Sequence, residues 1–418
     1  MRTKCISLFI VAVACSLARA QTTPLAQLIA EADGHNSGIR AAQQAWQAAT
    51  HAVAPASTLP DPEVSLQQMT VGSPLPFAGY STSNFAYTGV GVSQAVPFPG
   101  KLRLRGQMAR NDADASHANV ERIRRRVEEQ VKEAYIELAY LQETGNVLER
   151  DQQLLRQIER LALERYATGQ ITQGEVLAAQ LEQTNILRDI ALQGQQAAIV
   201  QAHMRALLGR GGGAPAITAE PLKMRRLASS TLPPLRTASD PNLAEQQARI
   251  DESNTSVQLA HKNFLPDFTA QYMYQRTGSR FPDYYQWTVG MSLPIHESRR
   301  QKEELAGAVE ERASAASAYQ AAQLEDEDAA NQQWISMHTD EQMLDLYRGG
   351  LLPQANARLQ AAQTAFQSNR ASLQPVLDAY RARYDLEQQY WHTLADHETA
   401  LAKLEQIAGP LPLEASHE

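Results

Sequence analysis

The chain has 418 residues, of which 20% are charged and only 6% are aromatic, and its formal net charge is −8. This acidic balance excludes the usual electrostatic mode of nucleic-acid binding. The shortage of aromatic residues, with long stretches rich in Ala, Gln, Leu, Glu and Arg, argues against ordinary globular domains and is typical of long helices or coiled coils.

Residues 1–20 are predicted to be a secretory signal peptide. Arg2 and Lys4 give a positive start, a short apolar run follows, and Ala18-Arg19-Ala20 has the small-residue pattern of a cleavage site. Removing the three positive residues of this segment changes the net charge to about −11.

Both cysteines of the chain, Cys5 and Cys15, fall inside this segment. The mature chain is therefore expected to form no disulfide and to offer no cysteine to a metal. The run Ala12-Val13-Ala14-Cys15 also loosely resembles a lipoprotein cleavage box, so a lipidated Cys15 remains an alternative.

The first half of the mature chain, residues 21–208, is predicted to alternate helices with strands. A helix over 25–53 ends near Pro55, and strands follow at 63–71 and 84–96 with period-two alternation. A proline-free helix then spans 101–167, and a return helix spans 172–208. The long helix has a coiled-coil rhythm of apolar residues, carried by Val127, Val131, Ala134, Leu138 and Leu141.

The second half, residues 242–418, repeats this order after a Gly-, Pro- and Ser-rich linker or irregular belt at 209–241. The predicted elements are a helix at 242–263, strands at 267–276 and 284–295, a long helix at 298–366 and a return helix at 372–408. An interruption of the long helix is expected from Gly349-Gly350 to Pro353.

Four landmarks recur in the same order in the two halves, which indicates an internal duplication. They are Leu59-Pro60-Asp61 with Leu265-Pro266-Asp267, Val90-Gly91-Val92-Ser93 with Val289-Gly290-Met291-Ser292, Tyr166-Ala167-Thr168-Gly169 with Phe366-Gln367-Ser368-Asn369, and Val176-Leu177-Ala178-Ala179 with Val376-Leu377-Asp378-Ala379.

The four strands have the length of tilted membrane-spanning strands, and no apolar run after the signal is long enough for a transmembrane helix. Four strands are too few to close a barrel, and open strand edges do not face lipid. We therefore expect other subunits, arranged around a cyclic axis, to complete the barrel.

The chain resembles the TolC family of outer-membrane efflux factors over essentially the whole mature sequence. The matching residues are Val90-Gly91-Val92-Ser93-Gln94, the segment Pro97-Phe98-Pro99-Gly100-Lys101, and the paired turns at Gly169 and Asn369. The length and the Pro-Phe-Pro-Gly-Lys segment are most similar to the cation-efflux, CzcC-like branch.

The resemblance implies a mainly α fold with a small transmembrane β part. Three subunits would form a twelve-stranded outer-membrane barrel and a periplasmic α-barrel of antiparallel coiled-coil helices. It also implies a passive duct without enzyme activity or cofactor, which binds outer-membrane lipid, a periplasmic adaptor (membrane fusion protein) and, through it, an inner-membrane pump. Heavy-metal cations are the substrates expected for the CzcC-like branch.

In this reading the turns at Gly169 and Asn369 are the periplasmic tips, where both residue types suit left-handed backbone. We expect the adaptor to contact the exposed residues of these tips. They are Gly169, Gln170, Ile171 and Thr172 in the first tip, and Asn369, Arg370, Ala371 and Ser372 in the second.

Glu175 and Asp378 match positions where the family places acidic residues around the pore entrance, while the family's other acidic position in the second tip holds Pro375. Three copies of a carboxylate around an axis would favour cations. Ordinary solvated helix carboxylates are the simpler interpretation of either residue alone.

The sequence shows no catalytic or metal motif. The histidines, including His261 and His296, are scattered, and no His or Glu pair has metal-ligand spacing on a helix. Met69, Met273 and Met291 are explained by packing, and no nucleophile elbow or phosphate-binding loop is present. The alternative function is a periplasmic coiled-coil adaptor or scaffold without a pore.

Overall fold

The computed structural model describes residues 22–228, 231–232, 240–294 and 299–412. The predicted signal peptide, with Cys5 and Cys15, and the position of His296 lie outside the described residues. The chain divides into two compact units. Unit 1 comprises Met1–Gly34, Gln130–Arg225 and Ser336–Ala402, and unit 2 comprises His35–Glu129, Arg226–Ile335 and Lys403–Glu418.

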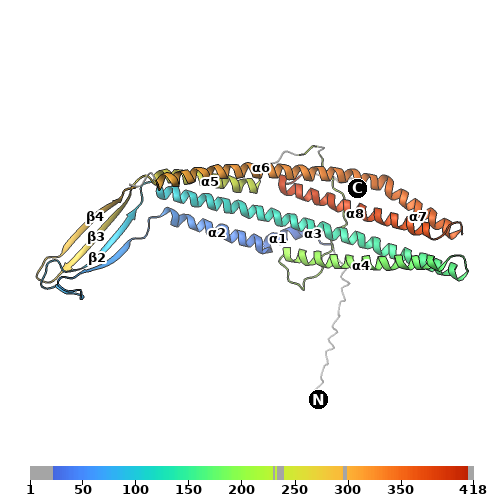
Figure 1. The fold of residues 1–418 in the computed structure, drawn as a ribbon, viewed down its shortest axis with the longest axis horizontal. Coiled ribbons are helices and arrows are strands. Elements are labelled where there is room, and N and C mark those ends of the chain that lie inside the picture. Colours follow the sequence, from blue (N-terminus) through green and yellow to red (C-terminus); the bar gives the residue numbers. More distant parts are fainter. Residues whose placement is uncertain (1–21, 229–230, 233–239, 295–298, 413–418) are drawn as a thin grey trace, which may run out of the picture. The chain divides into compact units, whose positions relative to one another are not determined.

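Unit 2 holds a four-stranded antiparallel sheet in the order β1-β2-β3-β4 (Figure 1). The strands are β1 (Glu63–Met69), β2 (Tyr87–Val96), β3 (Asp267–Thr277) and β4 (Tyr284–Ser292). The pairing of β2 with β3 joins the two halves of the sequence in one sheet.

Three strands are shorter than predicted, and for β1 and β2 the reason is a longer loop between them. β1 ends at Met69, since the Val71 amide donates to the Ala78 carbonyl within the loop. β2 begins at Tyr87 rather than 84, because the Phe85 amide donates to the Ser83 hydroxyl. β4 ends at Ser292, and residue 295, its predicted end, lies outside the described residues.

The helices of unit 2 pack as neighbouring pairs along α2 (Ser37–Ser57), the first part of α3 (Lys101–Ala167), α5 (Pro241–Lys262) and the first part of α6 (Gln301–Leu346). Trp46 of α2 meets His117 of α3 edge to face, with ring centroids 4.7 Å apart. Arg122 of α3 forms an ion pair with Glu245 of α5 at 3.2 Å. A small apolar cluster joins α5 to α6.

The predicted continuous helix at 25–53 is wrong in two respects. It is broken into α1 (Leu25–His35) and α2 because Asn36 caps the second helix, accepting hydrogen bonds from the amides of Gly38 and Ile39. The second helix also continues past Pro55 to Ser57. Proline removes one donor there, but the Ser57 hydroxyl donates to the Val53 carbonyl in the last turn.

Unit 1 contains two helical hairpins built from opposite halves of the sequence. α3 continues to Ala167 and returns as α4 (Gln173–Leu207), and α7 (Leu352–Gln367) returns as α8 (Gln374–Ala408). Buried side chains from all four helices form one core cluster next to the turns. Among them are Ile158, Val176, Leu359, Phe366 and Leu377. The burial of this core orders the turns, as packing of an apolar face stabilises most helices in proteins.

The predicted interruption of the second long helix takes the form of a π-helical turn, η2 (Tyr347–Leu351), between α6 and α7. The Leu352 amide donates to the Tyr347 carbonyl five residues earlier. Pro353 explains the local widening, because it has no amide hydrogen and its ring clashes with the carbonyl four residues before it.

The described part of the predicted linker is an extended strap, and its first stretch is bound to unit 1. Gln201 both donates to and accepts from the main chain of Ile217. Further along, Glu398 of α8 accepts from the amide and the guanidinium of Arg225, at 2.7 and 2.6 Å. These contacts favour the irregular belt over a free linker for the stretch from Ile217 to Arg225.

The predicted fold class is confirmed: the structure is mainly helical, with very long helices and four antiparallel strands. Helix α3 alone has 67 residues, which corresponds to about 100 Å at 1.5 Å per residue.

Candidate functional site

The sheet of unit 2 separates apolar from polar side chains on its two faces. In register, Val64 pairs with Val92, which pairs with Tyr272, which in turn pairs with Trp287. Partners in register point to the same face, so this row crosses all four strands. The exposed fractions of Val64, Leu66, Trp287 and Val289 are 70%, 81%, 77% and 80%. Such exposure of large apolar side chains on one face marks a surface that meets an apolar environment.

The opposite face of the sheet is polar and crowded at one point. A Cβ on Gly91 would lie 2.8 Å from the Ser65 hydroxyl, so a larger residue there would force the Ser65 side chain to move. The residues that share this face are mostly amides and hydroxyls: Ser65, Gln67, Ser93, Thr269, Gln271, Gln275, Gln286 and Thr288. The alternation predicted from the sequence thus divides the sheet into one apolar and one polar face.

The Pro97–Lys101 segment that carries the family resemblance holds the second half of the chain at the base of the sheet. The Asp267 carboxylate accepts from the Phe98 amide at 2.7 Å and from the Lys101 ammonium at 2.9 Å. Lys101 also donates to the Leu265 carbonyl at 3.0 Å and is only 3% exposed. This contact fixes the start of α3 next to the start of β3.

The two hairpin turns of unit 1 have the left-handed backbone that was predicted. The φ angles of Gly169 and Asn369 are 72° and 60°. In each turn the next amide reaches back five residues, from Gln170 to the Arg165 carbonyl and from Arg370 to the Ala365 carbonyl, both at 2.8 Å. Both long helices therefore end in the same Schellman-type turn, as expected for a duplicated unit.

The predicted tip residues fall into two groups by exposure. Ile171 and Ala371 are half-buried, and Ile171 packs against the core of the hairpins. The other six are exposed: Gly169, Gln170, Thr172, Asn369, Arg370 and Ser372. Thr172 caps α4 through a reciprocal capping box with Glu175.

A set of contacts around Arg165, which we call the clasp, joins the two tips and was not predicted from the sequence. Arg165, only 8% exposed, lies with its guanidinium carbon 4.4 Å above the ring of Phe366. Its nitrogens donate to the Gln367 carbonyl at 2.9 Å and to the Asn369 side-chain oxygen at 3.3 Å. Asn369 thus has two roles, because it tolerates the left-handed turn and accepts a hydrogen bond that glycine could not.

Glu175 belongs to the same clasp. Its carboxylate accepts from the Thr172 amide at 3.0 Å and from the Leu373 amide of the second tip at 3.1 Å. Hydrogen bonds from these two main-chain amides lower the pKa of Glu175, which keeps its side chain ionised. Asp378 is exposed, accepts from Gln374 at 2.8 Å, and lies 3.6 Å from Arg381.

Ion pairs to buried carboxylates link the helices behind the tips. Asp151 is fully buried and accepts from Arg383, which is 5% exposed. Arg381 donates to Glu182 across α8 and α4. Partners about 200 positions apart in the sequence cannot be recognised from spacing, and only the matching charge on facing helices would have pointed to them.

No group of three or more His, Cys, Asp or Glu side chains that could hold a metal is found among the described residues. His261 is exposed on α5.

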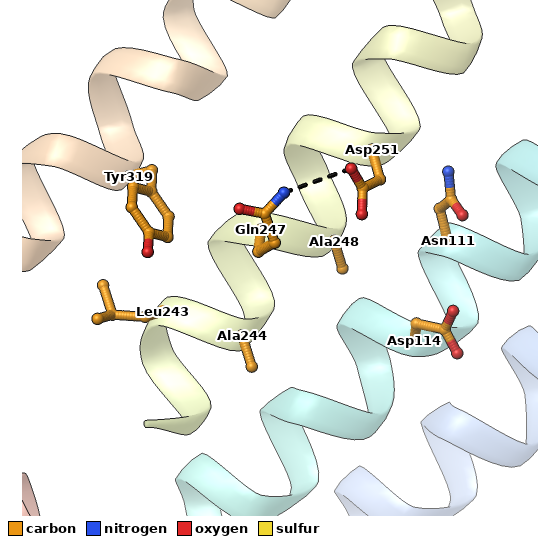
Figure 2. Close-up of a pocket in the computed structure, with 8 residues that line it drawn as sticks. All are labelled: Asn111, Asp114, Leu243, Ala244, Gln247, Ala248, Asp251 and Tyr319. Atoms are coloured by element: carbon orange, nitrogen blue, oxygen red, sulfur yellow. Dashed lines mark hydrogen bonds between the residues drawn. The ribbon is translucent and has the colours of Figure 1, made fainter. Parts of the chain in front are cut away.

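A hollow of about 360 Å³ lies along α5, between α3 and α6, in unit 2 (Figure 2). Asp114 and Asp251 line it, and the Gln247 amide donates to Asp251 at 3.3 Å (Figure 2). The residues that line it include no nucleophile paired with a base.

In the part of the chain that the structure describes, no helix is long and apolar enough to cross a membrane.

Comparison with known proteins identifies the class. A family model described as outer membrane efflux protein matches residues 28–210 and again residues 232–410. The chain therefore belongs to the outer membrane efflux protein family, which is the TolC family predicted from the sequence. The repeated match agrees with the internal duplication. The sequence matches no curated protein.

Solved structures of outer-membrane channels share the fold. The outer-membrane channel OprN matches with a TM-score of 0.80 and 14% identity, over 92% of this chain and 89% of its own. VceC of Vibrio cholerae matches with 0.78 and 19%, over 92% and 96%. MtrE of Neisseria gonorrhoeae, solved in its open state, matches with 0.77 and 16%, over 92% and 88%.

The family match places the chain in the outer membrane as a channel subunit for efflux. It favours this function over a periplasmic scaffold without a pore.

Proposed function

We propose that three copies of this chain form a passive duct through the outer membrane, with twelve strands in the barrel and the long helices continuing as a periplasmic tube. The observation that carries the proposal is the sheet: one face is apolar and exposed, the other is polar, and β1 and β4 each have one neighbouring strand. An open sheet edge in lipid would leave backbone groups unpaired, so neighbouring copies must supply the missing strands.

The hairpin tips are the proposed docking site for a periplasmic adaptor, which in turn joins an inner-membrane pump. The exposed residues Gln170, Thr172, Arg370 and Ser372 support this role, because they surround two turns that a common core holds rigidly. The duct has no energy source or cofactor of its own, so the partner pump must supply the driving force.

The proposed substrates are cations, in line with the CzcC-like resemblance of the Pro97–Lys101 segment. Glu175 and Asp378 support this choice, because three copies of each would form acidic rings at the tube entrance. The ionised state of Glu175 favours such a ring. Among cations, we propose heavy-metal ions as the specific substrates.

Cysteine crosslinking in isolated outer membranes tests the duct. A Val64→Cys/Val289→Cys variant carries one cysteine on each edge strand, on the same face. Oxidation is expected to produce covalent dimers and trimers that require detergent for extraction, and moving the β4 cysteine to Trp287 or Met291 finds the register. The control is Val64→Cys/Val92→Cys, whose positions pair within one chain and should close without joining subunits. A freely soluble monomer with every pair would overturn the proposal.

A further inference from the structure

The loop between β1 and β2 contains no charged residue. Residues 70–86 include no Asp, Glu, Lys or Arg, although 20% of the whole chain is charged. The loop instead presents large apolar side chains to its surroundings. The exposed fractions of Val71, Leu75, Phe77 and Phe85 are 37%, 68%, 62% and 67%. Residues of this kind are normally buried or absent from a loop that faces water.

The loop is built so that it presents these side chains. The Val71 amide donates to the Ala78 carbonyl, and the Ala78 amide donates to the Leu75 carbonyl, which folds the segment on itself. Phe77 has a φ of 62°, a left-handed conformation that a bulky residue rarely adopts. Its ring meets Tyr80 edge to face, with centroids 6.2 Å apart. Strained backbone of this kind persists where the surroundings enforce it, often at functional positions.

The β3–β4 loop provides a contrast within the same sheet. It contains Arg280 and Asp283, and the Asp283 carboxylate accepts a hydrogen bond from the Tyr274 hydroxyl at 2.6 Å. At this end of the sheet the β3–β4 loop therefore carries charged residues, and the loop 70–86 carries none. The two loops also touch, because a Cβ on Gly278 would collide with the Tyr80 main chain. The two loops therefore differ in polarity although they are in contact.

We propose that the loop 70–86 is a membrane anchor, in which Leu75, Phe77 and Phe85 insert into the interfacial layer of the outer-membrane lipid. The proposal rests on the proposed function, since it requires the sheet to lie in the membrane with exposed apolar side chains such as Leu66, which is 81% exposed, facing lipid. An uncharged segment with aromatic side chains suits the boundary between headgroups and acyl chains. A charged loop would resist that position.

Site-directed spin labelling tests this assignment on the assembled protein in phosphatidylcholine–phosphatidylglycerol vesicles. Labels are attached to Phe77→Cys, and to Leu75→Cys as a second position should the first variant fail to fold. Val289→Cys, on the apolar face of β4, is the lipid control, and Ser279→Cys, exposed on the β3–β4 loop, is the water control. The ratio of accessibility to oxygen over a water-soluble nickel chelate separates the two environments.

The loop labels are expected to give a ratio below that of Val289, because they lie in the interfacial layer, but several-fold above that of Ser279. A ratio like that of Ser279 would overturn the anchor. Spin–spin broadening that disappears when labelled subunits are diluted with unlabelled ones would also overturn it, because the loop would then contact a second copy. If Val289 itself gives the ratio of Ser279, the membrane placement of the sheet is wrong and the proposed function fails together with the anchor.

Discussion

The Lys101 ammonium lies 2.9 Å from the Asp267 carboxylate, and this pair joins the base of β3 to the first residue of α3. The Lys101 side chain is 4% exposed, whereas that of Asp267 is 41% exposed. The two residues come from different halves of the duplicated sequence. The segment that carries the family resemblance is therefore one of the places where the two halves are joined.

Because Lys101 is more deeply buried than Asp267, substitutions of the two residues should lower the free energy of unfolding by different amounts. Asp267→Asn leaves the buried ammonium without its counter-charge, and we expect it to lower the free energy of unfolding by about 1–3 kcal/mol. Lys101→Met removes the buried charge and keeps the packing of its stem, so the loss should be smaller. Thermal unfolding of the purified protein in detergent, followed by circular dichroism, measures both.

The control for this pair is Arg300→Met, which breaks the exposed ion pair with Glu304 and should change stability by less than about 0.5 kcal/mol. If Asp267→Asn and Lys101→Met lower the free energy of unfolding equally, the burial of the Lys101 ammonium does not determine the loss.

The clasp between the tips predicts a local effect of Arg165→Lys. Lysine keeps the charge but loses the planar fork that binds the Gln367 carbonyl and the Asn369 side chain while it stacks on Phe366. Amide hydrogen exchange is expected to rise in the second tip, at residues 366–372, and to change little at Leu155 in the shared core.

Arg358→Lys is the matched control, because Arg358 is exposed on α7. If Arg165→Lys leaves exchange in the second tip at the level of this control, the clasp does not order the tip.

Gly169 and Asn369 occupy equivalent left-handed turns, but substitutions at the two positions should lower stability by different amounts. Asn369→Gly keeps the backbone conformation and loses only the hydrogen bond from Arg165, so a loss of about 0.5–1.5 kcal/mol is expected. Gly169→Val places a β-branched residue at a φ of 72°, where the strain adds about 1–2 kcal/mol. Chemical denaturation of the two variants should rank Gly169→Val as the less stable, and the reverse order would contradict the turn geometry.

The pKa of Asp326 predicts a change of stability with pH. Burial, the charge of Asp240 and a hydrogen bond with Asp240 raise the pKa of Asp326 to about 6. The folded chain therefore binds more protons than the unfolded chain between about pH 4 and pH 6, and the free energy of unfolding falls as the pH rises through this window. Asp326→Asn should remove this loss and raise the melting temperature more at pH 7.5 than at pH 4.5.

Asp328→Asn, two positions along the exposed side of α6, is the control for this titration. A melting temperature of Asp326→Asn that follows wild type at both pH values would show that the carboxyl pair does not affect folding.

The elements of the fold were predictable where the sequence is periodic and bounded by proline or glycine. Helix α3 has its predicted bounds because no proline interrupts Lys101 to Ala167, and Pro353 marks the π-helical turn. The break at Asn36 was missed because its signal is one capping side chain within a sequence of good helix formers. The clasp of Arg165 could not be predicted from the sequence, because its partners lie about 200 residues away and one of them is a main-chain carbonyl.

The acidic residues near the tips predict the ion preference of the assembled duct. In planar bilayers under a KCl gradient, wild type is expected to prefer cations, because Glu175 is held ionised by two main-chain amides and Asp378 is exposed. Glu175→Gln/Asp378→Asn should move the reversal potential toward zero, since three copies of each charge are lost around the axis.

Glu164→Gln provides the matched control for ion preference, because Glu164 is exposed on α3, five residues before the turn at Gly169. It removes one charge per subunit outside the proposed rings, as Glu175→Gln or Asp378→Asn does alone, and should leave the reversal potential near the wild-type value. If both variants shift the potential equally, the preference comes from the overall acidity of the chain rather than from rings at the entrance. If neither shifts it, Glu175 serves its capping box and its bond to Leu373 alone, and the cation-selective entrance is wrong.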